Sequence, residues 1–359
     1  MDLNIKNPVY GKISVCMKNP NVTLTGTPPK LFPTLLKGFN TIANHWYMIL
    51  FPMVLDVLLW LGPKLKIKSL MSPFISSVMD SMLKFGPQEA AETWTAYQTM
   101  WAELLDQFNL ANALRTIPVG IPSIIARLSP TSSPLSVEPV YEIPSVNLVF
   151  AILLGLLLIG FFLGSLYFLL ISHLTADEAT RIEASELFSS FVQSMVMFCP
   201  IVLLLLFIML PVTMVLSLVS MVNFGIGQFL VLMAVFVMIW LLMPLVFSPH
   251  GVFVLKQKAL PSMLLSVRLV RLFLPGTGLF LFISILISEG LNYYVWTLPE
   301  ASSWMTLLSI GGHAFVVTGL LTASFIYYRE GLKWMQGNLQ KMAEASNSQQ
   351  QNGGTTLEQ

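Results

Sequence analysis

The chain has 359 residues, of which 55% are hydrophobic and only 10% are charged, and its mean hydropathy is +0.73. Soluble proteins carry about 25% charged residues, so this composition excludes an ordinary globular enzyme. The net charge of +1 offers no basic surface to nucleic acid, and two cysteines, Cys16 and Cys199, make a disulfide framework implausible.

Six apolar runs are each long enough to cross about 30 Å of hydrocarbon as a helix. They cover residues 39–61, 145–171, 191–219, 227–247, 274–296 and 304–328. We expect helices because lipid leaves each backbone polar group to be satisfied within its own segment, and because the runs lack the alternation of barrel strands. The sequence therefore predicts an all-α polytopic membrane protein with six transmembrane helices.

The first 37 residues contain five lysines and no apolar run, so we expect a cytoplasmic N-terminal segment without a cleavable signal peptide. The first transmembrane helix is predicted within residues 38–62, closed by Gly62 and Pro63. If the N-terminus is cytoplasmic, thirteen of the nineteen lysines and arginines fall on the inner side. This bias predicts that both termini are cytoplasmic.

Residues 63–144 are predicted to form an extracytoplasmic helical insertion, with helices over 72–85 and 87–114 and an irregular return from Pro118. Aromatic side chains recur at helical spacing on one face of the second helix, namely Trp94, Tyr97 and Trp101. Two interpretations remain open for this face. It lies at the membrane interface, or it is the packed face of a small helical cap.

Residues 145–328 are predicted to form a five-helix transmembrane region. Thr175 and Glu178 have the spacing of a capping box, which predicts a helix over 176–190 ahead of the third span. Gly160 and Gly164 form a small-xxx-small pattern, for which we expect internal packing rather than a dimer face. The cytoplasmic tail, residues 329–359, should be disordered from about residue 346 because its composition is polar.

A cytoplasmic helix over 259–273 is predicted to lie in the membrane plane. Its arginines stand beside apolar residues at helical spacing, which are Met263, Leu264, Val267 and Val270. Four basic residues here are candidates for contact with anionic lipid: Lys256, Lys258, Arg268 and Arg271.

Ionisable residues inside spans are costly, so Asp56, Glu289 and His313 are the candidate intramembrane polar site. They are interpreted either as a proton or cation site, or as a polar pocket for a headgroup. The structural alternative is a carboxylate that is paired across helices, or one that reaches the outer interface beside Trp60 or Tyr293. Neither metal-binding spacing nor a nucleophile elbow is present, so we expect no metal, no cofactor and no enzymatic activity.

One block resembles a known family. It contains Phe247-Ser-Pro-His-Gly-Val-Phe-Val-Leu255, then Lys256 and Lys258, then Ser266-Val-Arg-Leu-Val-Arg271 before an apolar span. This block is similar to the membrane domain attached to some bacterial glycerophosphodiester phosphodiesterases, in which an extended piece leads to an in-plane helix. The catalytic domain is absent, so the resemblance implies a membrane helper in a bacterial plasma membrane and carries over no active site.

Two functions are compatible with these features. The first is a non-enzymatic scaffold that faces lipid or binds a partner, with the bilayer and a membrane protein as its partners and no nucleic acid. The alternative is a small transporter or channel whose path includes Glu289 and Asp56.

Overall fold

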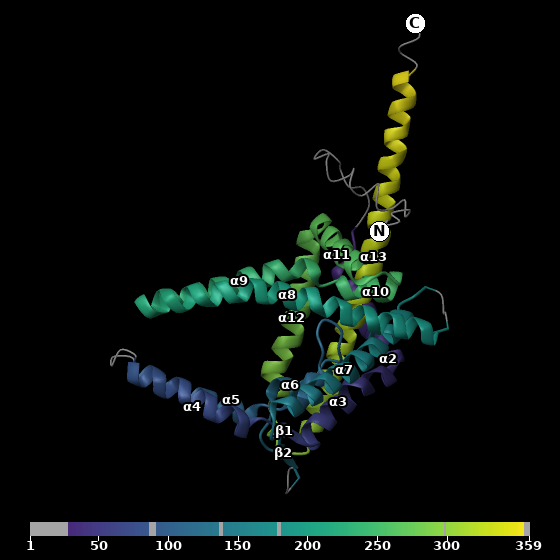
Figure 1. The fold of residues 1–359 in the computed structure, drawn as a ribbon. Coiled ribbons are helices and arrows are strands. Elements are labelled where there is room, and N and C mark those ends of the chain that lie inside the picture. Colours follow the sequence, from purple (N-terminus) through teal and green to yellow (C-terminus); the bar gives the residue numbers. More distant parts are fainter. Residues whose placement is uncertain (1–27, 86–90, 136–138, 178–180, 298, 355–359) are drawn as a thin grey trace.

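The computed structural model describes residues 28–85, 91–135, 139–177, 181–297 and 299–354 (Figure 1). Helices dominate the described residues, as predicted, and the fold is of the all-α polytopic membrane class. The helices are α2 (Leu31–Asn44), η1 (Trp46–Ile49), α3 (Leu50–Leu61), α4 (Lys68–Phe85), α5 (Ala91–Gln107), η3 (Leu110–Leu114), α6 (Ile125–Leu128), α7 (Val146–Leu174), α8 (Ala184–Val222), α9 (Phe224–Leu242), η4 (Met243–Leu245), α10 (Ser248–Leu255), α11 (Ala259–Leu272), α12 (Leu274–Leu291), η5 (Asn292–Trp296) and α13 (Thr306–Gly354).

Five helical segments in the described part of the chain are long and apolar enough to cross a membrane. They are Val146–Leu174, Ala184–Val219, Gly225–Leu255, Leu274–Trp296 and Thr306–Asn338. Each contains most of one predicted run, so these five expectations are confirmed by length and composition. A bent pair of helices near the N-terminus brings the total to six if it forms one span.

The first predicted span is not one straight helix. The segments Leu31–Asn44 and Trp46–Leu61 are bent by 93°. His45 leaves the helical conformation at the break, with φ −124° and ψ 49°. Pro52 has no N–H to donate one turn back, so it favours a fresh helix start at Leu50 over continuation. The 12 residues of α3 rise only about 18 Å.

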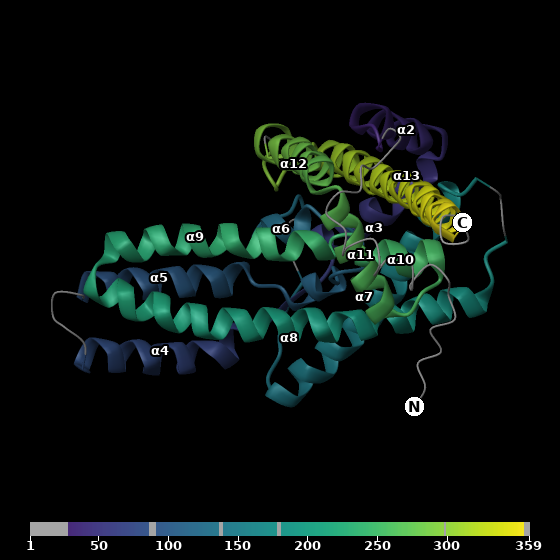
Figure 2. The same cartoon turned by 90° about the horizontal axis from the view of Figure 1, so that it is seen from above.

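Helix α13 passes through the body of the molecule, and α2 packs along it (Figure 1). The approach is close, because a Cβ added at Gly38 would lie 2.6 Å from the Cβ of Ala323. Two helical hairpins, α4–α5 and α8–α9, project from the body towards the same side (Figures 1 and 2). Residues 187–255, which include most of the α8–α9 hairpin, contain no Asp, Glu, Lys or Arg.

The long insertion is closed by a small sheet that the sequence did not predict. Strand β1 (Lys64–Lys66) pairs in parallel with β2 (Val140–Glu142), with Leu65 opposite Tyr141. The two ends of residues 63–144 are therefore held together. Between them, α4 starts earlier than predicted and contains Pro73, while α5 ends at Gln107 instead of Leu114. The predicted helix start at Pro87 lies outside the described residues.

Thr175 does not begin a helix, so the predicted capping box is wrong for this residue. Its other member, Glu178, lies outside the described residues. Thr175 ends α7 instead, and its hydroxyl donates to the carbonyl oxygens of Ile171 (3.1 Å) and Ser172 (3.0 Å). Carbonyl groups in the last turn of a helix lack internal partners, so a threonine serves there as well as at a start. Helix α8 begins only at Ala184.

The predicted disorder is also wrong for residues 346–354, whose backbone is helical because α13 continues to Gly354. No proline interrupts Thr306–Gly354. The polar residues 346–354 extend an existing helix, so they add turns without the cost of a new nucleus.

Helix α11 agrees with the predicted range 259–273, but it buries a different face. Leu264 is exposed, whereas Ser262 and Ser266 are fully buried. Their hydroxyls donate to the carbonyl oxygens of Ser248 and Pro244, respectively. The segment before α11 is the helix α10, not the extended piece that the family resemblance implies.

Candidate ligand pocket

An irregular segment, residues 114–127, enters the body between the helices. Its apolar side chains are buried, namely Val119, Ile121, Ile124 and Ile125. This segment packs closely against helix α7 at Gly160 and Gly164. An added Cβ would lie 2.5 Å from the carbonyl oxygen of Leu114 at the first glycine and 2.7 Å from the Cα of Gly120 at the second. The glycine pair therefore serves internal packing, as expected, although its partner is a loop.

Asp56 on α3 holds residues 123–125 of this segment in place through hydrogen bonds. Its side chain is fully buried and accepts a hydrogen bond from the Ser123 hydroxyl. The backbone N–H groups of Ile124 and Ile125 also donate to it, at 3.3 and 3.1 Å. Both carboxyl oxygens of Asp56 are thus occupied. This matches the structural alternative for Asp56, a carboxylate satisfied within the fold.

A pocket of about 320 Å³ lies on the other side of Ser123. The irregular segment, α12 and α13 provide its walls. Its polar lining consists of Arg115, Ser123, Arg127, Ser288, Glu289, Asn292 and His313, and its remaining lining of Pro122, Val317, Leu320 and Leu321. With two arginines against one glutamate and a neutral histidine, the lining carries a net positive charge.

The two arginines are both exposed but differ in their partners. Arg127 forms an ion pair with Glu289, and both side chains are about half exposed. The guanidinium of Arg115 makes no hydrogen bond or ion pair with any residue that the structure describes. Partial desolvation, and then the like charge of Arg127, lower the pKa of Arg115 from its ordinary value, against the opposing effects of Asp56 and Glu289. A pKa near 12 or higher is usual for arginine, so the group stays charged at neutral pH.

His313 completes the polar end of the pocket. It is 5% exposed, and its Nδ1 lies 2.9 Å from Oδ1 of Asn292, which accepts the bond. In a neutral ring that donates through Nδ1, Nε2 is an acceptor. That Nε2 is buried and has no hydrogen-bond partner among the described residues.

The three predicted intramembrane residues are therefore brought together around Ser123. Glu289 and His313 line the pocket, whereas Asp56 lies behind its wall. Sequence reasoning missed Arg115 and Arg127, which were counted only as basic residues of a long loop. The missed signal is the stretch 116–126 between them, eleven residues without charge and too apolar for an exposed loop.

The predicted lipid-contact residues differ in their pairing, although Lys256 is exposed like Lys258 and Arg271. Lys256 pairs with Glu186 at 3.1 Å, and Arg268 is partly buried. Lys258 and Arg271 are exposed.

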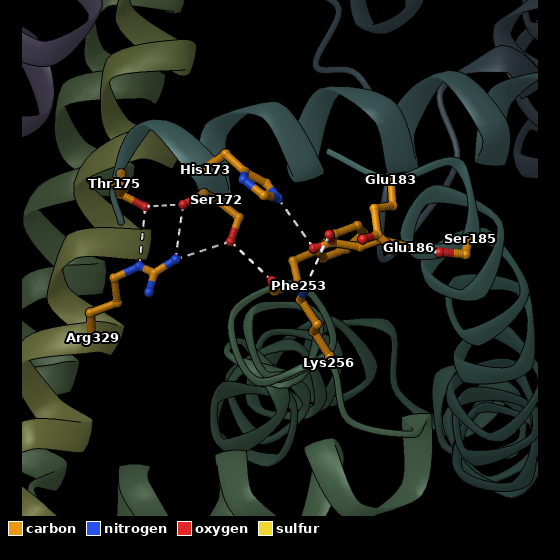
Figure 3. Close-up of polar contacts among 9 residues, drawn as sticks. All are labelled: Ser172, His173, Thr175, Glu183, Ser185, Glu186, Phe253, Lys256 and Arg329. Carbon is orange, nitrogen blue, oxygen red and sulfur yellow. Dashed lines mark hydrogen bonds and ion pairs between the residues drawn. The ribbon is translucent and has the colours of Figure 1, made fainter. Parts of the chain in front are cut away.

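Lys256 belongs to a polar junction between α7, α8, α10 and α13 (Figure 3). Glu186 on α8 also accepts from His173 Nε2 at 3.2 Å, so it joins α7 to the end of α10. On the other side, Arg329 donates to the carbonyl oxygen of Ser172 at 2.9 Å, and the Ser172 hydroxyl donates to the carbonyl oxygen of Phe253 at 3.0 Å. These groups satisfy one another, which indicates a structural role.

No family model, curated protein or solved structure matches the chain. The resemblance to the phosphodiesterase membrane domain therefore stays a prediction.

Proposed function

We propose that this chain is a non-enzymatic, lipid-facing membrane scaffold that binds an anionic group in the Arg115 pocket. One observation carries the proposal. Arg115 lines a pocket of about 320 Å³, and its guanidinium has no hydrogen bond or ion pair with another described residue. An unmatched guanidinium in a concave site attracts carboxylate or phosphate, with which it forms charge-assisted and often bidentate hydrogen bonds.

The geometry supports binding better than transport through Asp56 and Glu289. Both oxygens of Asp56 accept hydrogen bonds from residues 123–125, and Glu289 is paired with Arg127. A proton path through both acids would have to break these contacts in each cycle. Binding requires only that a ligand supply the acceptor that Arg115 lacks.

We further infer a plasma-membrane location with both termini in the cytoplasm; the distribution of basic residues supports this orientation, and the family resemblance suggests a bacterial membrane. In this orientation the pocket opens on the extracytoplasmic side, because residues 115–127 belong to the long insertion. Lys258 and Arg271 lie in the cytoplasmic connection before α12. Their exposure supports a contact with anionic headgroups there.

The test is titration of the full-length protein in a non-ionic detergent with inorganic phosphate, followed by calorimetry. We expect the unsubstituted protein to bind phosphate and Arg115→Gln to lose about tenfold to a hundredfold in affinity, since hydrogen bonds to charged groups contribute about 1.5–3 kcal/mol. Arg181→Gln, at an exposed arginine outside the pocket lining, is the matched control and should bind normally. Absence of phosphate binding, or equal affinity in Arg115→Gln, contradicts the proposal.

A further inference from the structure

The polar pocket continues into an apolar stripe on α12. Ile285 and Phe282 precede Glu289 by four and seven residues, so the three side chains share one face of the helix. Phe282 is 62% exposed and Ile285 55% exposed. The helix belongs to the candidate span Leu274–Trp296. A charged site at one end of this face therefore adjoins surface that a bilayer would cover with hydrocarbon chains.

The pocket wall formed by α13, opposite α12, also changes from polar to apolar along the helix. On α13, Val317 and Leu321 follow His313 by four and eight residues and line the pocket. Asn292 and His313 join the two helices at the polar end through their hydrogen bond. Beyond this bond the α13 lining residues Val317, Leu320 and Leu321 are apolar, as are Ile285 and Phe282 on α12. The groove between α12 and α13 is thus polar at one end and apolar towards the other.

This polarity specifies the ligand. We propose, building on the proposed function, that the pocket binds an anionic amphiphile with its headgroup between Arg115 and Arg127 and its hydrocarbon tail along Ile285 and Phe282 of α12. An anionic lipid meets both requirements, whereas a free anion uses only the polar end.

The experiment compares three probes on the full-length protein in a non-ionic amphipol, by calorimetry. They are inorganic phosphate, dihexanoyl phosphatidylglycerol and dihexanoyl phosphatidylcholine. We expect the phosphatidylglycerol to bind about tenfold or more tightly than phosphate, since burial of about two CH₂ groups accounts for that factor. The zwitterionic lipid, which has the same chains, should bind more weakly than the phosphatidylglycerol.

Variants separate the head from the tail. Ile285→Asn should reduce the affinity for phosphatidylglycerol towards that for phosphate and leave phosphate binding unchanged, which also shows that the variant is folded. Leu232→Asn, at a 70% exposed position on α9, should change neither affinity.

The outcomes distinguish the two proposals. If phosphate binds through Arg115 but phosphatidylglycerol binds no more tightly, the amphiphile is overturned and the anion site stands. Equal binding of the two lipids, or an unchanged lipid-to-phosphate ratio in Ile285→Asn, also overturns the amphiphile. If no anion binds, both proposals fall.

Discussion

The carboxyl group of Asp56 accepts hydrogen bonds from one hydroxyl and two backbone N–H groups of residues 123–125, in a fully buried position. Asp56→Ala would leave these donors without acceptors, at about 1–3 kcal/mol for each buried unsatisfied group. We expect a loss of about 2 kcal/mol or more in the free energy of unfolding, measured by denaturation in detergent.

Asp80→Ala is the matched control for this change, because Asp80 is exposed on α4. It should leave stability unchanged. If both variants have the same stability as the unsubstituted protein, Asp56 does not anchor residues 123–125 as described.

Glu289 competes with a bound anion for Arg127. Glu289→Gln removes that competition, so we expect phosphate to bind up to about fivefold more tightly, because a partly exposed ion pair contributes up to about 1 kcal/mol. Calorimetric titration measures this change. Weaker binding would mean that Glu289 takes part in holding the ligand. Loss of a proton-linked flux in the same variant would favour the transporter.

At the scale of elements, the contact between α2 and α13 depends on Gly38, where an added Cβ would overlap the backbone and Cβ of Ala323. Gly38→Ala should destabilise the protein by about 1–3 kcal/mol, the usual cost of overpacking. Gly155→Ala is the control, since nothing lies within 4 Å of an added Cβ on that glycine of α7. It should be neutral or slightly stabilising. Equal effects of the two variants would contradict close packing of α2 on α13.

Helices with long apolar runs could be predicted from the sequence, because hydrocarbon thickness sets their length. Shorter features could not. The bend at His45 depends on a local choice between continuing one helix and starting another at Pro52, and both are compatible with an apolar run. Pairing of β1 with β2 joins segments 76 residues apart, as in Lys64 opposite Val140, and no local pattern in the sequence records it.

The candidate site likewise contains some residues that the sequence indicates and others that it does not. Asp56, Glu289 and His313 stood out because ionisable groups in apolar segments are rare. The arginines did not, because a charged residue in a long loop is ordinary. Their importance arises from tertiary structure, in which the uncharged stretch 116–126 is buried against α3 and α7 and carries Arg115 and Arg127 to one pocket.

At the scale of the whole molecule, the expected topology places the long insertion and the C-terminal end of the α13 span on opposite sides of the membrane. In a background with Cys16 and Cys199 replaced by serine, we expect a membrane-impermeant maleimide to label Thr131→Cys in intact cells. Gln340→Cys on α13 should be labelled only after permeabilisation. The reverse pattern would invert the topology, and labelling of both positions in intact cells would contradict membrane crossing between them.

The central claim is that an anionic headgroup occupies the pocket beside Arg115. A single-particle map of the protein in nanodiscs that contain phosphatidylglycerol and phosphatidylcholine tests it most directly. We expect headgroup density within hydrogen-bonding distance of the Arg115 and Arg127 guanidinium groups, with chain density along Ile285 and Phe282. A pocket in which Arg115 instead pairs with a carboxylate of this chain, with no headgroup density, would contradict the account.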